Sequence, residues 1–160
     1  MRVVVNYRSS DADADAAVEA IRAAGGEAIA SRADVRDPRE VDELVKAVSA
    51  QWGAIEVLVN TVRIPFPIKS FQDMTWEEFG GKLHDERLAA FTLTKAVAPA
   101  MIDQGYGRIV HIATGLARQP RAETIALGSS KAALVQVHPL RGPGAGPLRH
   151  HRQMWPPRAW

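Results

Sequence analysis

The stretch that decides the fold lies near the start of the chain and reads RVVVNYRSSDADADAAVEAIRAAGG over residues 2–26. Its first six residues are rich in β-branched side chains, which favour a strand. After a short polar break, alanines, Val18 and Ile21 recur at the spacing of one helical face. The glycine pair at residues 25–26 ends that pattern. The stretch is therefore predicted to form one strand followed by one helix.

The same succession of strand and helix signals continues to about residue 137. Asp37 is a predicted helix cap, and Pro38 suits the first position of the helix that follows. Thr75 is predicted to cap a long helix with acidic residues in its first turn. The predicted strands are residues 2–7, 27–33, 55–60 and 107–114, and the predicted helices are residues 11–24, 38–48, 75–101 and 128–137.

The buried face of the long helix is predicted from its large apolar residues. These residues are Trp76, Phe79, Leu83, Ala90 and Phe91.

Strands that alternate with helices of this length indicate βαβ units and a parallel sheet. Such sheets bind ligands beyond the carboxyl ends of their strands. The residues that follow the predicted strands are therefore the first candidates for a site. They are Tyr7 to Ser9, Asp34 with Val35, Asn60 with Thr61, and Thr114 with Gly115.

Composition excludes several kinds of chemistry. The chain has 160 residues and a formal net charge of +2, which suits one globular domain. It has no cysteine, so disulfides, thiolate metal sites and cysteine nucleophiles are excluded. No apolar run reaches the ~18 residues that a membrane helix needs, and the start of the chain does not resemble a signal peptide. We therefore expect a cytoplasmic protein with no membrane partner.

The last residues of the chain differ in composition from the rest. Residues 138–160 contain four arginines, five of the ten prolines and no acidic residue. The first 137 residues then carry 16 basic and 18 acidic residues, so the basic character belongs to the tail. We predict one domain over residues 1–137 and a disordered Pro/Gly/Arg-rich tail over residues 138–160.

Two alternatives concern this tail. Trp155 and Trp160 could stack on nucleic acid, but a structureless tail is the simpler interpretation, and no nucleic-acid partner is expected. His150 and His151 are adjacent residues on that tail and would be poor ligands, so no metal site is expected either.

Six short stretches, in order along the chain, resemble the short-chain dehydrogenase/reductase family, and most closely its bacterial 3-oxoacyl-[acyl-carrier-protein] reductases. The resemblance covers residues 1 to about 136. The matching stretches are VVNYRS (4–9), ADV (33–35), VLVN (57–60), TKAV (94–97), GRIV (107–110) and SSKAAL (129–134).

The resemblance implies an α/β fold, namely a Rossmann-like doubly wound parallel sheet. Residues 2–7 match the family's second strand, so the sheet is expected to be incomplete. It would lack the first strand with its Gly-rich, phosphate-binding turn, and also the last strands. The abrupt change after residue 136 prompts the hypothesis of a frame shift near codon 137, together with a start codon assigned inside the gene.

For the cofactor, the resemblance implies NADP rather than NAD, since Arg8 and Ser9 follow the strand where the family selects the 2′-phosphate. It places Asp34 and Val35 beside the adenine and Asn60 at a turn close to the cofactor. That turn reads NTVR (60–63) where relatives have Asn-Asn-Ala-Gly. Without the resemblance, Arg8 would be a solvated turn cation and Asp34 a polar turn residue.

For catalysis, the family uses a Tyr four residues before a Lys, a Ser at a strand end and an Asn in the long helix. The Lys is matched by Lys131 and the Ser by Thr114. The Tyr position is Leu127, which can neither give nor take a proton, and we place the Asn position at Arg87. The alternatives are that Lys131 is a helix-surface lysine and Thr114 a turn hydroxyl. His111 is expected to be a packed strand histidine rather than a base.

Two functions follow from these expectations. The first is an NADP(H)-dependent oxidoreductase that reduces a carbonyl, with turnover impaired or absent because Leu127 replaces the proton donor. Whether this chain is itself an enzyme stays open. The second is a non-catalytic remnant, or pseudoenzyme, that acts as a homo-oligomer partner or as a subunit of a related enzyme through the helix over residues 75–101.

Overall fold

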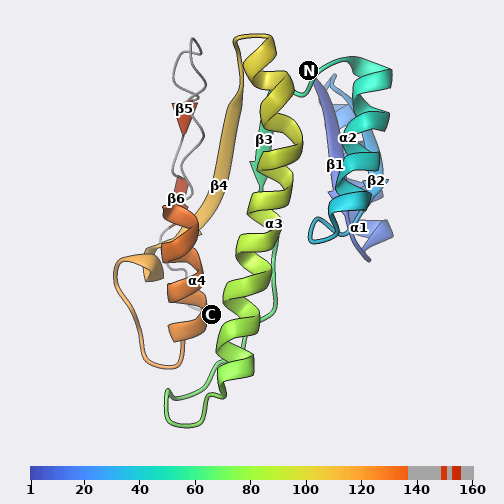
Figure 1. Cartoon of the computed structure of the whole chain (residues 1–160). Coiled ribbons are helices and arrows are strands. Elements are labelled where there is room, and N and C mark those ends of the chain that lie inside the picture. Colours follow the sequence, from blue (N-terminus) through green and yellow to red (C-terminus); the bar gives the residue numbers. More distant parts are fainter. Residues whose placement is uncertain (137–148, 151–152, 156–160) are drawn as a thin grey trace. The chain divides into compact units, whose positions relative to one another are not determined.

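The computed structural model describes residues 1–136, 149–150 and 153–155. The chain divides into two compact units, Met1–Ile55 and Glu56–Trp160. Figure 1 shows the elements of both units as a ribbon. No helix in the described part of the chain is long and apolar enough to cross a membrane.

The first unit is a βαβα segment built on two parallel strands. Strand β1 (Arg2–Tyr7) pairs with β2 (Glu27–Arg32) over its whole length, from Arg2 opposite Glu27 to Tyr7 opposite Arg32. Helix α1 (Asp11–Ala23) connects the two strands, as parallel pairing requires. The predicted strand and helix of the opening stretch are therefore confirmed.

Helix α2 (Pro38–Trp52) follows β2 and begins where the sequence predicted. The Asp37 side chain accepts a hydrogen bond from the backbone N–H of Arg39, and Pro38 occupies the first turn. Val41 and Val48 of this helix are buried, and so are Val18 of α1 and Ala28 of β2. These side chains make up much of the apolar core of the first unit.

The second unit is a parallel sheet centred on β4 (Arg108–Thr114). Strand β3 (Val57–Asn60) pairs with one edge of β4. The short strands β5 (Arg149–His150) and β6 (Gln153–Trp155) also pair with β4, in one continuous parallel register. The remainder of the predicted tail, residues 137–148, 151–152 and 156–160, lies outside the described residues.

The described residues of the second unit include two long helices. Helix α3 (Trp76–Asp103) connects β3 to β4, and α4 (Ile125–Val135) follows β4 after the one-turn helix η1 (Gly115–Ala117). Figure 1 shows α3 and α4 side by side along the same face of this sheet. The other face leaves Val57 and Val59 about half exposed. The predicted parallel α/β architecture is thus confirmed.

Helix α3 begins as predicted but buries a different face. Thr75 accepts a hydrogen bond from the backbone N–H of Glu78, and the Glu78 carboxylate accepts one from the backbone N–H of Thr75, which is a capping box. Ala90 is buried as predicted, but Trp76 and Phe91 are 75% and 60% exposed, so their predicted burial is wrong. The buried face mixes small side chains such as Ala89 and Ala98 with larger ones such as Leu93 and Met101.

The fourth helix also begins earlier than predicted. The sequence pattern placed its start at Gly128, whereas the helix begins at Ile125. Ala126 is fully buried, so the first turn already packs against the core. At Gly128 an added Cβ would lie 3.0 Å from the carbonyl oxygen of Leu116, so the missing side chain allows α4 to approach η1 closely.

Candidate active site

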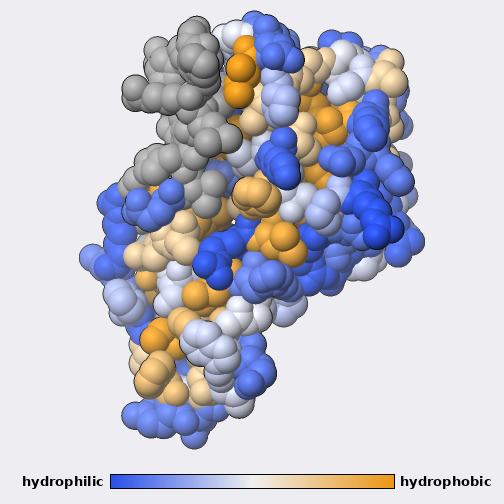
Figure 2. Space-filling model, viewed as in Figure 1, coloured by the Kyte–Doolittle hydropathy of each residue, from blue (hydrophilic) through white to orange (hydrophobic). Residues whose placement is uncertain are grey.

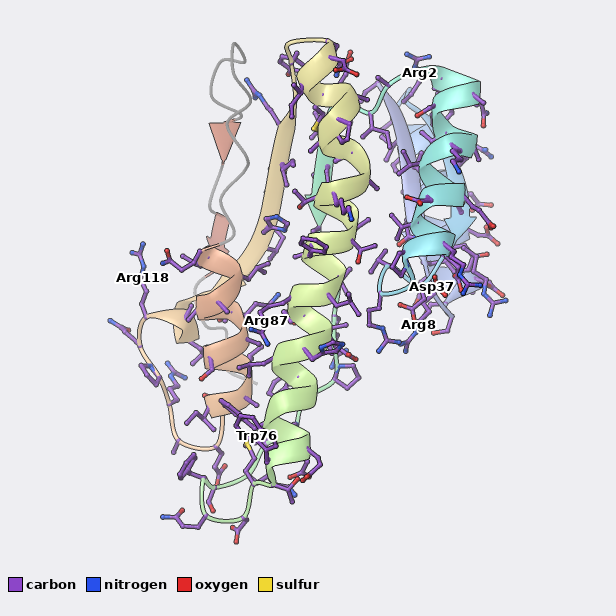
Figure 3. The ribbon with its side chains drawn as sticks, in the orientation of Figure 1. Arg2, Arg8, Asp37, Trp76, Arg87 and Arg118 are labelled. Carbon is purple, nitrogen blue, oxygen red and sulfur yellow. The ribbon has the colours of Figure 1, made fainter. Side chains whose placement is uncertain are left out.

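In the first unit the predicted site residues lie where β1 and β2 end. Arg8 follows β1 and has a side chain that is 54% exposed; its Nη1 lies 4.0 Å from Oδ2 of Asp34. Ser9 is exposed beside it. Figure 3 shows Arg8 and Asp37 at one end of this unit and Arg2 at the other. The structure therefore places Arg8 and Asp34 near each other at the carboxyl ends of β1 and β2.

Asp34 is strongly engaged within its own turn. Its carboxylate accepts side-chain hydrogen bonds from Arg36 at 2.9 and 2.6 Å and one from the Arg36 backbone N–H at 3.0 Å. The Arg36 guanidinium lowers the pKa of the Asp34 carboxyl from 3.8 to about 2. Val35 is buried in the core of the unit. Asp34 is thus ionised and shapes the turn, while Arg8 has the more exposed side chain of the two.

In the second unit Asn60 holds the turn after β3. Its Oδ1 accepts a hydrogen bond from the backbone N–H of Val62 at 3.1 Å. Its Nδ2 lies 3.3 Å from Nδ1 of His111. Asn60 is buried, and both of its side-chain polar atoms have partners within the protein. Its observed role is to fix the backbone between β3 and the loop that follows.

Thr114 ends β4 and begins η1. Its Oγ1 accepts a hydrogen bond from the backbone N–H of Leu116 at 3.4 Å, so part of its role is that of a turn hydroxyl. The hydroxyl hydrogen is free to rotate toward another acceptor. His111 is a packed strand residue in contact with Asn60, in agreement with the prediction.

Lys131 is held firmly beside β4. Its Nζ donates hydrogen bonds to the carbonyl oxygen of Ile112 at 2.9 Å and to Oε1 of Glu86 at 2.5 Å. Its side chain is only 13% exposed, which rules out the alternative of a helix-surface lysine. Leu127 lies one helical turn earlier on α4 and is half-buried. A charged donor is therefore present near the carboxyl end of β4, while the neighbouring position has no polar group.

Glu86 and Lys82 belong to the same cluster and were missed by the sequence reasoning. Lys82 donates hydrogen bonds to Oε2 of Glu86 at 2.7 Å and to the carbonyl oxygen of Ile64 at 2.8 Å. The adjacent Arg87 is exposed and donates instead to the carbonyl oxygen of Leu83 on its own helix. Of these two neighbours, Glu86 is the one that contacts Lys131. Its signal in the sequence was an oppositely charged i, i+4 pair on the alanine-rich face.

Each unit, taken by itself, carries groups that suit one part of a nicotinamide dinucleotide. Exposed Arg8 and Ser9 suit a phosphate, and the Lys131 ammonium has three donors, two of which are used within the described residues. The segment between β1 and α1 is Arg8 to Ser10, which contains no glycine to cradle a pyrophosphate. The described residues hold no group of three or more potential metal ligands.

Comparison with known proteins identifies the family of the chain. A family model described as short chain dehydrogenase matches residues 1–139. A 3-oxoacyl-[acyl-carrier-protein] reductase from Synechocystis sp. is 40% identical over 112 residues, which is 70% of this chain and 45% of the relative. A 2,3-dihydro-2,3-dihydroxybenzoate dehydrogenase from Bacillus subtilis is 33% identical over 120 residues, 74% of this chain and 45% of the relative.

Solved structures show the same likeness. A short chain dehydrogenase from Burkholderia cenocepacia in complex with NADP is 35% identical, with a TM-score of 0.72 over 84% of this chain and 54% of that one. An NAD+-bound xylitol dehydrogenase is 28% identical, with a TM-score of 0.76 over 84% of this chain and 51% of that one. The chain spans about half the length of the relatives that it matches.

Proposed function

This chain belongs to the short-chain dehydrogenase family, and from that premise we propose that it is an NADP(H)-dependent oxidoreductase for a carbonyl substrate of the 3-oxoacyl thioester class. The observation that carries the proposal is the half-buried ammonium of Lys131, which is fixed by Ile112 next to the carboxyl end of β4. The substrate class follows the names of the relatives with similar sequences.

NADP is proposed over NAD because of the charge at the end of β1. Arg8 presents a largely exposed guanidinium there, beside the exposed Ser9. A cation with neighbouring hydroxyls suits a 2′-phosphate, whereas a free carboxylate would suit a ribose 2′-hydroxyl. The nearby carboxylate of Asp34 is already bound to Arg36, so it does not offer that alternative. When bound, the dinucleotide supplies the hydride chemistry.

The chain's own residues contribute unequally to the reduction of a carbonyl. The Thr114 hydroxyl at the end of β4 would donate a hydrogen bond to the substrate oxygen, and Lys131 would bind a ligand hydroxyl with its remaining N–H. Leu127 supplies no proton for the alkoxide that develops on that oxygen. We therefore propose that ligand binding is retained better than turnover.

A second candidate function is that of a non-catalytic subunit. The observation in its favour is the exposed surface of α3, where Trp76 and Phe91 are 75% and 60% exposed. Figure 2 shows apolar residues at the surface of the second unit among hydrophilic ones. Exposed aromatic side chains of this size are common at protein interfaces, so α3 would supply the contact with a like chain or a related enzyme.

The test is an assay of NADPH oxidation with a 3-oxoacyl thioester, run on the full chain beside a fluorescence titration with NADPH. We expect saturable NADPH binding and a turnover at least a hundredfold below that of a family member with the Tyr present. Turnover at a rate typical of such enzymes would refute the proposed impairment. Absence of binding up to millimolar NADPH would favour the non-catalytic subunit.

A further inference from the structure

Helix α3 carries a buried ion pair, Lys82 with Glu86, that has no part in the proposed function. Lys82 and Glu86 have side chains only 2% and 4% exposed, and each is fixed by more than one contact. Lys82 binds the carbonyl oxygen of Ile64, and its ammonium lies 5.5 Å from the centre of the Phe66 ring. Burial of charges at this depth is costly unless they are paired, so the arrangement needs all of its members.

Glu86 bridges the two lysines with one oxygen each. Oε2 accepts from Lys82 and Oε1 accepts from Lys131. Because Lys82 cannot move away from the Ile64 carbonyl without losing a buried hydrogen bond, the carboxylate is held in one orientation. Lys131 is therefore fixed on two sides, by Glu86 of α3 and by the backbone of β4.

We propose that Glu86, anchored by Lys82, is the positioning residue for Lys131: it holds the ammonium in one place and directs the N–H that has no acceptor among the described residues toward a ligand oxygen at the carboxyl end of β4. The inference rests on the proposed function for the identity of that ligand, a hydroxyl of the dinucleotide. Two ammonium groups and one carboxylate leave one positive charge in excess, which favours an additional acceptor.

The first test needs no cofactor. The full chain is treated with an amine-acetylating reagent, and the rate at each lysine is followed by mass spectrometry. In Glu86→Gln the neutral carboxamide holds the Lys131 ammonium less tightly than the carboxylate does, so the amine leaves its mostly buried position more often, and we expect acetylation of Lys131 to become at least threefold faster. Exposed Lys46 serves as the internal reference, and Glu77→Gln, on an exposed carboxylate of the same helix, is the matched control.

The second test separates positioning from a general loss of structure. NADPH affinity should fall at least fivefold in Glu86→Gln, while the affinity for 2′,5′-ADP, which lacks the nicotinamide half, should stay unchanged. Should Glu86→Gln fail to fold, Lys82→Met/Glu86→Leu removes the ion pair in favour of apolar side chains of similar size, and the same faster acetylation is expected.

An unchanged acetylation rate at Lys131, or an equal loss of NADPH and 2′,5′-ADP binding, would overturn the role of Glu86. Failure of the parent chain to bind NADPH would instead overturn the proposed function, while the acetylation rates would still decide whether Glu86 holds Lys131.

Discussion

At the scale of single residues, Asp34 shows how an ion pair at a strand end contributes to stability. The Arg36 hydrogen bonds lower the pKa of Asp34 to about 2, below its ordinary 3.8. A carboxyl with a lowered pKa in the folded state stabilises it at all pH values well above 3.8, and the contribution is lost as the pH falls through about 2.

Asp34→Asn should therefore destabilise the fold at pH 7, because the ion pair with Arg36 is lost. We expect a change of about 1–2 kcal/mol, less than the full pKa shift implies, because the group is partly exposed and solvent screens the pair. The difference from the parent should shrink as the pH falls from about 5 to about 2, because the unfolded chain takes up a proton at Asp34 near pH 3.8 whereas the folded carboxyl stays ionised until about 2. Urea unfolding at several pH values measures it, with Asp42→Asn on the exposed side of α2 as control. A difference that does not vary with pH would contradict the assignment.

Leu127 is the second residue with a specific prediction. A phenol introduced by Leu127→Tyr would lie one helical turn before Lys131 and restore a proton donor. A positioned general acid typically raises the rate of such a reaction by about 10²–10⁴-fold. We expect NADPH-dependent reduction of a 3-oxoacyl thioester to rise at least tenfold over the parent. Leu127→Phe adds the ring without the hydroxyl and is the control. Equal rates in the two variants would show that the missing donor does not limit turnover.

Individual site residues were predictable to different degrees. Arg8 and Lys131 were both located by the family resemblance. The structure places Arg8 directly after β1, and Lys131 on α4, where it binds the carbonyl oxygen of Ile112 near the end of β4. Glu86 was missed because a charged residue on an apolar helix face reads as exposed unless its partners are known. Its partner Lys131 is 45 residues away, and short-range patterns do not report such pairs.

At the scale of elements, the glycines of α3 and α4 have opposite roles. Gly81 lies inside α3, and an added Cβ there would meet nothing within 4 Å. Gly128 of α4 lies against η1, where an added Cβ would come within 3.0 Å of the Leu116 carbonyl oxygen. The first glycine weakens its helix, whereas the second permits packing.

Gly81→Ala should therefore stabilise the protein by about 0.5–1 kcal/mol, the usual cost of a glycine inside a helix. Gly128→Ala should destabilise it, because a backbone oxygen has to move to admit the methyl group. Thermal unfolding followed by circular dichroism measures both changes. Stabilisation by both substitutions would mean that α4 does not approach η1 closely.

The starts of α2 and α3 were more predictable than the buried face of α3. Asp37 and Thr75 cap α2 and α3 through local hydrogen bonds, which depend on residues two or three positions away. The buried face of α3 depends instead on α4 and the sheet, elements distant in the sequence. Ala89 and Ala90 belong to that face although they are small, whereas the larger apolar side chain of Trp76 is exposed.

At the scale of the whole molecule, the sheets have open edges. In the described residues β1 pairs only with β2, and β3 pairs only with β4. Strands β1 and β3 therefore each have one edge without a neighbouring strand. Unpaired strand edges next to apolar side chains favour association with other chains. Val57 and Val59 of β3 are both about half exposed beside such an edge.

The full chain should therefore self-associate at micromolar concentration, and Val57→Lys/Val59→Lys should shift it toward the monomer. Sedimentation velocity measures the distribution. Phe71→Lys is the control, since Phe71 is 70% exposed in the loop before α3 and lies outside the sheet. A parent chain that sediments as a sharp monomer would contradict the prediction.

The parallel α/β class was predictable from the alternation of strand and helix patterns over residues 2–114, because each pattern is local. The pairing of Arg149–His150 and Gln153–Trp155 with β4 was not, because their strand character comes from the neighbouring strand and not from their own arginine- and proline-rich surroundings.

The central claim is that this member of the short-chain dehydrogenase family binds NADP(H) through the basic end of β1. Parallel fluorescence titrations of the full chain with NADPH and NADH, repeated on Arg8→Ala, test it most directly. The account predicts saturable binding of NADPH at least tenfold tighter than that of NADH, and loss of this preference in Arg8→Ala. Equal affinity for the two nucleotides, or no saturable binding of either at millimolar concentration, would contradict it.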